Sequence, residues 1–145
     1  MSITYKQGDL FTSLAETLVI PVNCRGVAGR GVALTCKQKY PQWFAEYQQR
    51  CQQGRVTIGS GFYYDNLQGA DLFAVPTKDD WRDPSQLIYV VKALQAVKRA
   101  CQVCQLESIA VPKLGCGAGG LSWRDVCPLM VSVLSQLPCE VMIYV

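Results

Sequence analysis

The sequence contains no histidine. Histidine is the usual general base of Ser-His and Cys-His hydrolases and the commonest metal ligand in proteins, so its absence excludes both kinds of catalysis and any histidine metal site. Cys101 and Cys104 form a CxxC pair, but the second such pair that would complete a zinc ribbon is missing. We therefore expect a protein without a bound metal.

Long apolar runs are also lacking. No stretch approaches the roughly 18 apolar residues of a membrane span, and residues 1–10 contain no signal-peptide core. We expect an intracellular, cytoplasmic protein in which the eight cysteines stay reduced. Cys101 and Cys104 fall at the end of a predicted helix, whereas a redox pair opens one. We interpret most of the cysteines as small apolar core residues.

Charge of either sign is sparse. Charged residues make up 17% of the chain, the net charge is +3, and there is no run of five or more basic residues. Such a balance permits contact with a polyanion without requiring it. Half of the 145 residues are hydrophobic, which is typical of one globular domain spanning residues 1–145.

What the sequence does contain is an alternation of strand and helix patterns. The predicted strands span residues 2–6, 18–22, 62–64, 72–76, 107–111 and 139–145. The predicted helices span residues 32–40, 42–51, 84–104 and 123–137. This order predicts an α/β fold with a mixed, mainly parallel sheet covered on both faces. Ligands of such sheets bind beyond the carboxyl ends of the strands.

The start of the third helix carries a local signature. Asp83 is predicted to cap it, Pro84 to occupy its first position and Gln86 to complete a capping box. Its apolar face is predicted to contain six residues at three- to four-residue spacing. These are Leu87, Val90, Val91, Leu94, Val97 and Cys101.

Two glycine-rich turns, residues 26–31 and 115–120, are the main functional signal, because each is predicted to run from a strand into a helix. Glycine lets the backbone approach a phosphate, and the helix behind it offers N–H groups and a positive dipole end. One such turn is more often only a tight connection, but two in one chain predict a diphosphate site. Residues 115–120 also match GxGxxG, yet only one helix and one strand follow, so we reject a classical dinucleotide-binding fold.

Three polar residues follow predicted strands. Lys78 could stabilise charge or act as acid, base or nucleophile at the ligand edge, or be a solvated loop lysine. Asn23 offers its amide to ribose hydroxyls. Asp9 could accept an exocyclic amine such as that of adenine, or simply cap a turn. Tyr63 and Tyr64 also fall near this edge, and we interpret both as core residues.

These residues together resemble the macro domain family. The motifs are residues 8–10, 22–33, 76–78 and 115–123, and the resemblance covers residues 3–145. Within the family the chain looks most like the ALC1-like class and, there, like the DarG-type antitoxin domains that remove ADP-ribose from DNA. The resemblance implies a three-layer α/β/α fold that binds ADP-ribose without a cofactor.

The resemblance also implies residue roles. Asp9 would hold the adenine amine, Asn23 would orient the distal ribose, and Lys78 would be the catalytic residue that acts on the C1″ linkage. The implied ADP-ribose-binding residues are Asp9, Leu10, Arg25, Gly26, Val27, Gly29, Gly31, Val32, Thr77, Gly115, Cys116, Gly117, Ala118, Gly119, Gly120 and Leu121.

Four positions depart from the pattern of the class. Gly119 stands where the glycohydrolase that acts on protein-linked ADP-ribose has an aspartate, which favours a DNA-linked substrate. Asp80 replaces a histidine usual in DarG-type domains, Cys24 replaces a threonine, and Lys113 replaces a small residue or proline. These differences bear on substrate preference more than on fold.

Three functions remain open from the sequence. The first is a monomeric hydrolase that removes ADP-ribose from a thymidine-type base in single-stranded DNA, partnered with a DarT-like toxin system. The second is a reader that binds ADP-ribose without turnover, and the third a hydrolase of ADP-ribosyl esters on protein or of O-acetyl-ADP-ribose. The toxin-binding domain of DarG proteins is not in this sequence, so we expect a stand-alone enzyme, an excised domain or a reduced relative. Candidate DNA contacts are Arg25, Arg30, Trp81, Arg82 and Lys113.

Overall fold

The structure is a computed structural model that describes residues 2–145. Its elements alternate in the predicted order. The strands are β1 (Ser2–Lys6), β2 (Thr17–Asn23), β3 (Phe62–Tyr64), β4 (Asp71–Lys78), β5 (Ser108–Pro112) and β6 (Glu140–Tyr144). The helices are α1 (Gly31–Lys39), α2 (Pro41–Gln52), α3 (Leu87–Cys104) and α4 (Trp123–Leu134), with short 3-10 turns η1 (Leu10–Thr12) and η2 (Gly117–Gly119). Within residues 2–145, no helix is both long and apolar enough to span a membrane.

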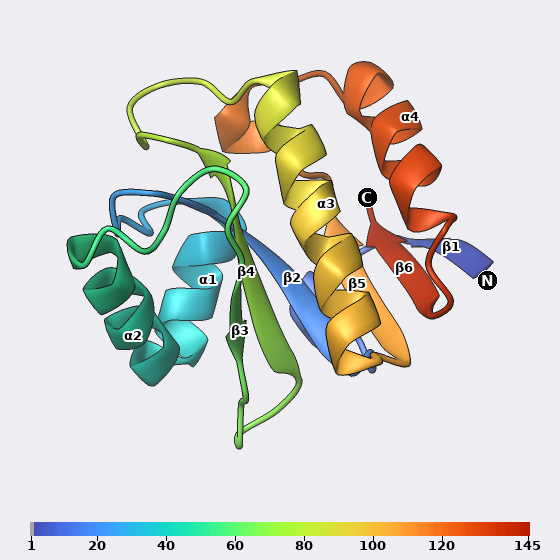
Figure 1. The fold of residues 1–145 in the computed structure, drawn as a ribbon, viewed down its shortest axis with the longest axis horizontal. Helices are drawn as coiled ribbons and strands as arrows, with labels where there is room; N and C mark the ends of the chain where they lie inside the picture. Colours follow the sequence, from blue (N-terminus) through green and yellow to red (C-terminus); the bar gives the residue numbers. More distant parts are fainter. Residues whose placement is uncertain (1) are drawn as a thin grey trace.

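The strands form one sheet in the order β1-β6-β5-β2-β4-β3 (Figure 1). Every neighbouring pair is parallel except β3 and β4, which are antiparallel. Parallel neighbours require long crossover connections, and α3 and α4 lie in the connections that lead into β5 and β6. The mixed, mainly parallel α/β sheet predicted from the sequence is thus confirmed.

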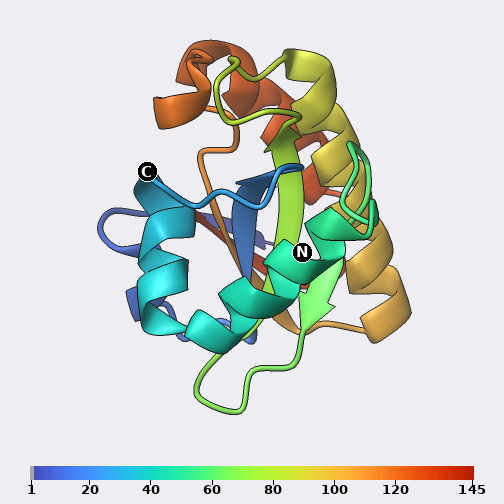
Figure 2. The ribbon, with the colours of Figure 1, turned by 90° about the vertical axis from the view of Figure 1, so that its left-hand side faces the viewer.

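Helices cover both faces of the sheet. Figure 2 shows α1 and α2 on one side of the strands and α3 on the other. The two faces build separate apolar clusters, and β2 contributes to both, with Val19 on the α3 side and Leu18, Ile20 and Val22 on the α1 side. Burial on both faces explains why this strand is a continuous apolar run.

The start of α3 differs from the prediction. The helix begins at Leu87, and Gln86 occupies the cap position without a side-chain cap bond, so the assignments of Asp83 and Pro84 were wrong. The physical reason is Ser85, which is buried; its Oγ donates to the Thr77 carbonyl and its N–H donates to the Gly119 carbonyl at 2.9 Å. These long-range bonds hold the segment out of the helix.

The buried face of α3 is also rotated from the prediction. Val90, Leu94, Val97 and Cys101 are buried, but Leu87 is 40% exposed and Val91 is half-buried. Ala93 and Ala96 are buried in their place. Their small side chains let the helix pack closely on the sheet.

The cysteines divide by depth. Cys36, Cys101 and Cys139 are buried, four others are half-buried, and Cys104 is exposed. Three of the eight cysteines are thus fully buried, so the interpretation of most of them as core residues holds only in part. Burial raises the pKa of Cys36 and of Cys101 to about 12, so both thiols stay protonated and unreactive at neutral pH.

Candidate functional site

The carboxyl ends of four parallel strands line one cavity of about 810 Å³. The lining residues at these ends are Asn23 of β2, Lys78 of β4, Pro112 of β5 and Tyr144 of β6. Parallel strands end on the same side of a sheet, so polar groups that follow different strands converge there. The aromatic residue Tyr63, predicted near this edge, lies at the other end, where its hydroxyl donates to Asp71 at 2.8 Å.

Both glycine-rich turns form walls of this cavity. Its lining includes residues 27–31 at the start of α1 and residues 115–119 around η2. Arg30 provides no side-chain cap for α1, so the first turn of that helix keeps N–H groups for a ligand. The cavity therefore has two backbone walls suited to phosphate oxygens, as the sequence predicted.

Two glycines of the second turn, Gly115 and Gly117, are required for different reasons. Both have the left-handed backbone that favours glycine, with φ of +74° at Gly115 and +61° at Gly117. A Cβ atom at Gly115 would lie 2.8 Å from side-chain atoms of Val90 and Leu121, whereas one at Gly117 would meet nothing within 4 Å. Gly115 is thus required by packing, and Gly117 only by the turn.

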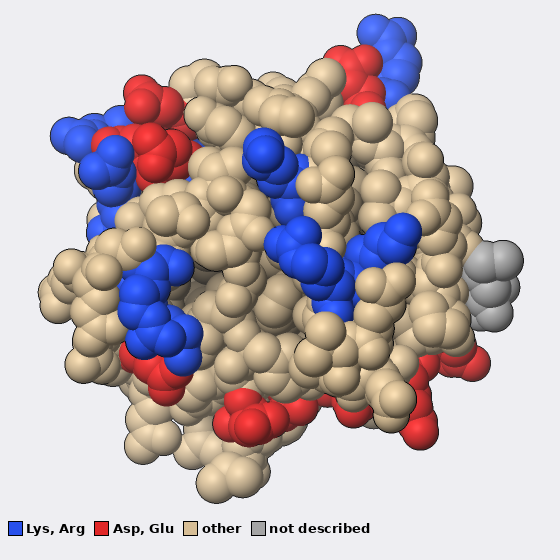
Figure 3. All heavy atoms as spheres, in the orientation of Figure 1, with Lys and Arg blue, Asp and Glu red and all other residues tan. Residues whose placement is uncertain are grey.

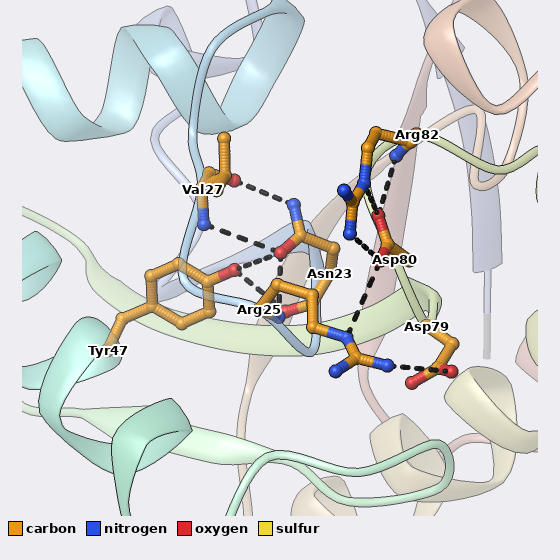
Figure 4. Close-up of polar contacts among 7 residues, drawn as sticks. All are labelled: Asn23, Arg25, Val27, Tyr47, Asp79, Asp80 and Arg82. Atoms are coloured by element: carbon orange, nitrogen blue, oxygen red, sulfur yellow. Dashed lines mark hydrogen bonds and ion pairs between the residues drawn. The ribbon is translucent and has the colours of Figure 1, made fainter.

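Asn23 organises the loop that follows β2 (Figure 4). Its Oδ1 accepts the N–H groups of Arg25 at 2.9 Å and Val27 at 3.4 Å, and its Nδ2 donates to the Val27 carbonyl at 2.7 Å. The Tyr47 hydroxyl lies 2.7 Å from the Asn23 carbonyl and 3.1 Å from Oδ1. Burial raises the pKa of Tyr47, so the hydroxyl keeps the proton that it donates. Only one amide hydrogen of Asn23 is left for a ribose hydroxyl.

Lys78 lies at the end of β4 and is half-buried. Its Nζ donates to the Trp81 carbonyl at 3.2 Å. The residue lines the main cavity and also an adjoining pocket of about 370 Å³. The structure thus places this lysine between two hollows of the ligand edge and not in a solvated loop.

Asp9 caps a turn and also lines the cavity. Its Oδ1 accepts the N–H of Phe11 at 2.9 Å and so caps η1. The residue also lines the cavity, together with Leu10 and Phe11. One carboxylate oxygen has lone pairs left for a ligand amine after the cap bond is made.

Four charged residues form a cluster beside the cavity (Figure 4). Arg82 donates to both carboxylate oxygens of Asp80, at 2.9 and 2.7 Å. Arg25 lies 3.5 Å from Asp79 and 3.8 Å from Asp80. The hydrogen bonds from Arg82 hold the pKa of Asp80 well below its usual range, so this carboxylate stays ionised at acidic pH.

Most of the predicted ligand-binding residues line the main cavity, and four do not. Arg25 turns toward Asp79 and Asp80, Gly26 packs on Gln48, and Leu121 packs against the α3 core cluster. Gly120 lines only the adjoining pocket. The residues that were predicted and do line the cavity are Asp9, Leu10, Asn23, Val27, Gly29, Gly31, Val32, Thr77, Lys78, Gly115, Cys116, Gly117, Ala118 and Gly119.

Several lining residues were not assigned to the ADP-ribose site from the sequence. Tyr144 and Val145 line the cavity at the end of β6, and Phe11 lines it beside Asp9. The rule that ligands lie beyond strand carboxyl ends was sufficient to find Tyr144. Phe11 carried no such signal, because its orientation depends on the turn η1.

The candidate DNA-contacting residues lie at several positions. Arg30, Trp81 and Lys113 line the main cavity, Arg82 lines only the adjoining pocket, and Arg25 lines neither. Figure 3 shows basic side chains over α3 and a mixed acidic and basic group where the chain between β4 and α3 runs. This face therefore carries no single uninterrupted basic surface.

The sequence matches a known protein family and several of its members. Residues 19–130 match the Macro domain family. The chain is 45% identical, over 94% of its length, to the DNA ADP-ribosyl glycohydrolase of Mycobacterium tuberculosis, and 38% identical, over 98%, to that of Thermus aquaticus. It spans about 40% of the length of these relatives.

Solved structures agree with the sequence matches. The macrodomain of Mycobacterium tuberculosis DarG superposes with a TM-score of 0.95 at 44% identity, covering 99% of this chain and 97% of that one. Thermosipho africanus DarTG in complex with ADP-ribose superposes with a TM-score of 0.90 at 30% identity, covering 97% of this chain and 41% of that one. The chain belongs to the macro domain family.

Proposed function

We propose that this domain binds ADP-ribose in the main cavity and hydrolyses it from a nucleobase of single-stranded DNA, with Lys78 as the catalytic residue. The similarity to DNA ADP-ribosyl glycohydrolases and to a relative solved with ADP-ribose supports this. So does the cavity, which reaches from Asp9, in the turn after β1, to Lys78 at the end of β4.

In this proposal, the adenine, diphosphate and distal ribose of ADP-ribose lie one after another along the cavity. The Asp9 carboxylate suits the adenine amine, and the two backbone walls suit the diphosphate. Asn23 and Lys78 then stand near the distal ribose. Because the loop of residues 26–31 is already bonded through Asn23, little ordering is needed when the ligand binds.

The position of Lys78 carries the catalytic part of the proposal. Among residues 2–145, it is the one basic residue at a strand end that lines both the cavity and the adjoining pocket. This supports a position beside the bond between C1″ and the leaving base. Hydrolysis there breaks the bond between C1″ and the base, adds the hydroxyl of water to C1″ and returns a proton to the base. Of residues 77–80, Lys78 alone can bring positive charge to that bond.

The relative in Thermosipho africanus, a fusion of a DNA ADP-ribosyl transferase with a glycohydrolase, favours a transferase as the source of the substrate. We propose that a DarT-like toxin produces the modified DNA and that the domain acts on it as a monomer in the cytoplasm. No cofactor is required for hydrolysis.

The test is cleavage of a thymidine-linked ADP-ribosylated single-stranded oligonucleotide by the wild type and by Lys78→Ala, with an ADP-ribosylated glutamate peptide alongside. We expect cleavage of the oligonucleotide only, and a Lys78→Ala variant that is inactive but still binds ADP-ribose in calorimetry. Lys92→Ala, which changes a lysine on α3, is the matched control and retains activity.

Other outcomes identify the alternatives. Binding of ADP-ribose without cleavage of either substrate would make the domain a reader. Cleavage of the peptide or of O-acetyl-ADP-ribose in preference to the oligonucleotide would make it an ester hydrolase. In either case the proposed DNA substrate is wrong.

A further inference from the structure

The adjoining pocket begins where the main cavity ends. The two share five lining residues, namely Arg30, Lys78, Trp81, Ala118 and Gly119. The remaining walls of the second pocket are Arg82, Asp83, Pro84 and Gly120. A group attached to C1″ of a ribose near Lys78 would therefore enter this pocket, whose walls do not include Asp9.

The walls of this second pocket suit a flat ring next to an anion. Trp81 is 44% exposed, and the Arg82 guanidinium lies 5.5 Å from the centre of its ring. Pro84 and the Gly119-Gly120 backbone are also uncharged surface. An exposed indole beside apolar and backbone walls is a stacking surface that accepts any nucleobase.

The positive charge of the pocket comes from Arg30 and Lys78, with Asp83 as its acidic wall residue. Arg82 is already paired with Asp80 through two hydrogen bonds, which offsets its charge. Arg30 is exposed, and its guanidinium makes no ion pair or hydrogen bond within residues 2–145. An arginine of this kind at the rim of a stacking surface is suited to a backbone phosphate.

The Trp81 wall is held in place before any ligand binds. The N–H of Cys24 donates to the Asp79 carbonyl at 3.1 Å, and the N–H of Ser85 donates to the Gly119 carbonyl at 2.9 Å. The Lys78 ammonium donates to the Trp81 carbonyl at 3.2 Å. The turn is thus hydrogen-bonded at both ends and in the middle, so little conformational entropy is lost in ordering it when a ligand binds.

We propose that the second pocket binds the nucleotide that carries ADP-ribose, with its base against Trp81 and a neighbouring phosphate at Arg30. This inference rests on the proposed function. A base inside a duplex cannot reach the indole, so the pocket requires single-stranded or extruded DNA. An acidic protein side chain would leave the stacking surface unused, so the pocket selects nucleotide-linked ADP-ribose.

The test measures binding in the Lys78→Ala background, where the substrate is not consumed. Fluorescence anisotropy would give the Kd of an ADP-ribosylated single-stranded oligonucleotide, and calorimetry that of free ADP-ribose. Trp81→Ala should weaken oligonucleotide binding roughly 5- to 150-fold, the range expected for loss of one stacked base, and change ADP-ribose binding far less. Leu67→Ala, a fully exposed side chain in the turn between β3 and β4, is the control.

Arg30→Gln has a separate signature. Loss of one phosphate contact should lower the slope of log Kd against log salt by about 0.7 for a single strand. Arg55→Gln, an exposed arginine that lines neither pocket, should leave this slope unchanged. Thermal unfolding of each variant verifies that it is folded, so a loss of binding is not a loss of structure.

The outcomes separate this inference from the function on which it rests. If the wild type does not bind ADP-ribose, the proposed function itself is wrong. If ADP-ribose binds and the oligonucleotide is cleaved, but Trp81→Ala behaves like Leu67→Ala, the second pocket does not hold the base. Equal losses for both ligands in Trp81→Ala would likewise overturn the pocket assignment, and so would an ADP-ribosylated peptide that binds as tightly as the oligonucleotide.

Discussion

At the scale of single residues, the site depends on side chains that hold other groups in place. The Oδ1 and Nδ2 atoms of Asn23 are both hydrogen-bonded to the loop that follows β2. The hydroxyl of Tyr47, on α2, donates to the Asn23 carbonyl. The amide therefore acts on a bound ribose chiefly by shaping the wall beside it. This role is distinct from that of Lys78, whose ammonium, within residues 2–145, is hydrogen-bonded to one carbonyl alone.

Asn23→Ala should lower both stability and affinity. The substitution leaves the N–H groups of Arg25 and Val27 without their acceptor, which costs about 2 kcal/mol for a largely buried site. Urea unfolding measures the first effect and calorimetry with ADP-ribose the second. Tyr47→Phe, which removes the supporting hydroxyl from outside the cavity, should give smaller changes in the same direction. Unchanged affinity in Asn23→Ala would show that the loop keeps its shape without the amide.

At the scale of elements, the site is built where strands end and helices begin. The turn around η2 uses glycine for two reasons, and the two positions can be separated by substitution. The turn between β4 and α3 is hydrogen-bonded to the loop after β2 through Cys24, and to the second glycine-rich turn through Ser85. The three segments therefore form one continuous rim around the cavity.

Gly115→Ala and Gly117→Ala should differ in their effects. Each places alanine in a left-handed backbone, at a cost of about 1–2 kcal/mol. Gly115→Ala also forces its Cβ atom against Val90 and Leu121, raising the expected loss of stability to about 3 kcal/mol. In thermal unfolding, the melting temperature of Gly115→Ala should therefore be lower than that of Gly117→Ala. Gly117→Ala should mainly weaken ADP-ribose binding. Equal melting temperatures would contradict the packing role of Gly115.

At the scale of the whole molecule, the sheet separates two apolar clusters, and each contains a buried thiol. Cys36 lies in the cluster under α1 and α2, and Cys101 lies in the cluster under α3 and α4. Burial raises the pKa of both from 9.0 to about 12. Because the folded protein holds these protons more tightly than the unfolded chain, alkaline pH favours unfolding.

Stability should accordingly fall as pH rises. Below pH 9 both thiols are protonated in the folded and in the unfolded chain, so their contribution to the free energy of unfolding is fully present. This contribution is lost between pH 9 and about 12, where the unfolded chain releases the protons first. Each buried thiol adds up to about 1.4 kcal/mol per pH unit to the decline. Urea unfolding across this range should show a shallower decline for Cys36→Ala than for the wild type, whereas Cys104→Ala, at an exposed position, should match the wild type. A parallel decline in all three proteins would exclude Cys36 as a source.

The sequence by itself determined the order of the elements and the place of the two glycine-rich turns. Apolar periodicity and turn residues act over a few positions, and backbone sterics translate them directly into strands and helices. The convergence of Asn23 and Lys78 also followed, because parallel strands end at one edge. Where Asp9 was left between a cap and a ligand contact, the structure allows both.

Only the tertiary structure decided which way individual side chains turn. Arg25 pairs with Asp79, 54 positions away in the chain, and so leaves the cavity that its loop lines. Ser85 bonds to Thr77 and Gly119 and so delays the start of α3. The second pocket likewise exists only because the turn after β4 is fastened against the loop after β5. Such contacts join segments that are distant in sequence, and their energies depend on packing that no local pattern encodes.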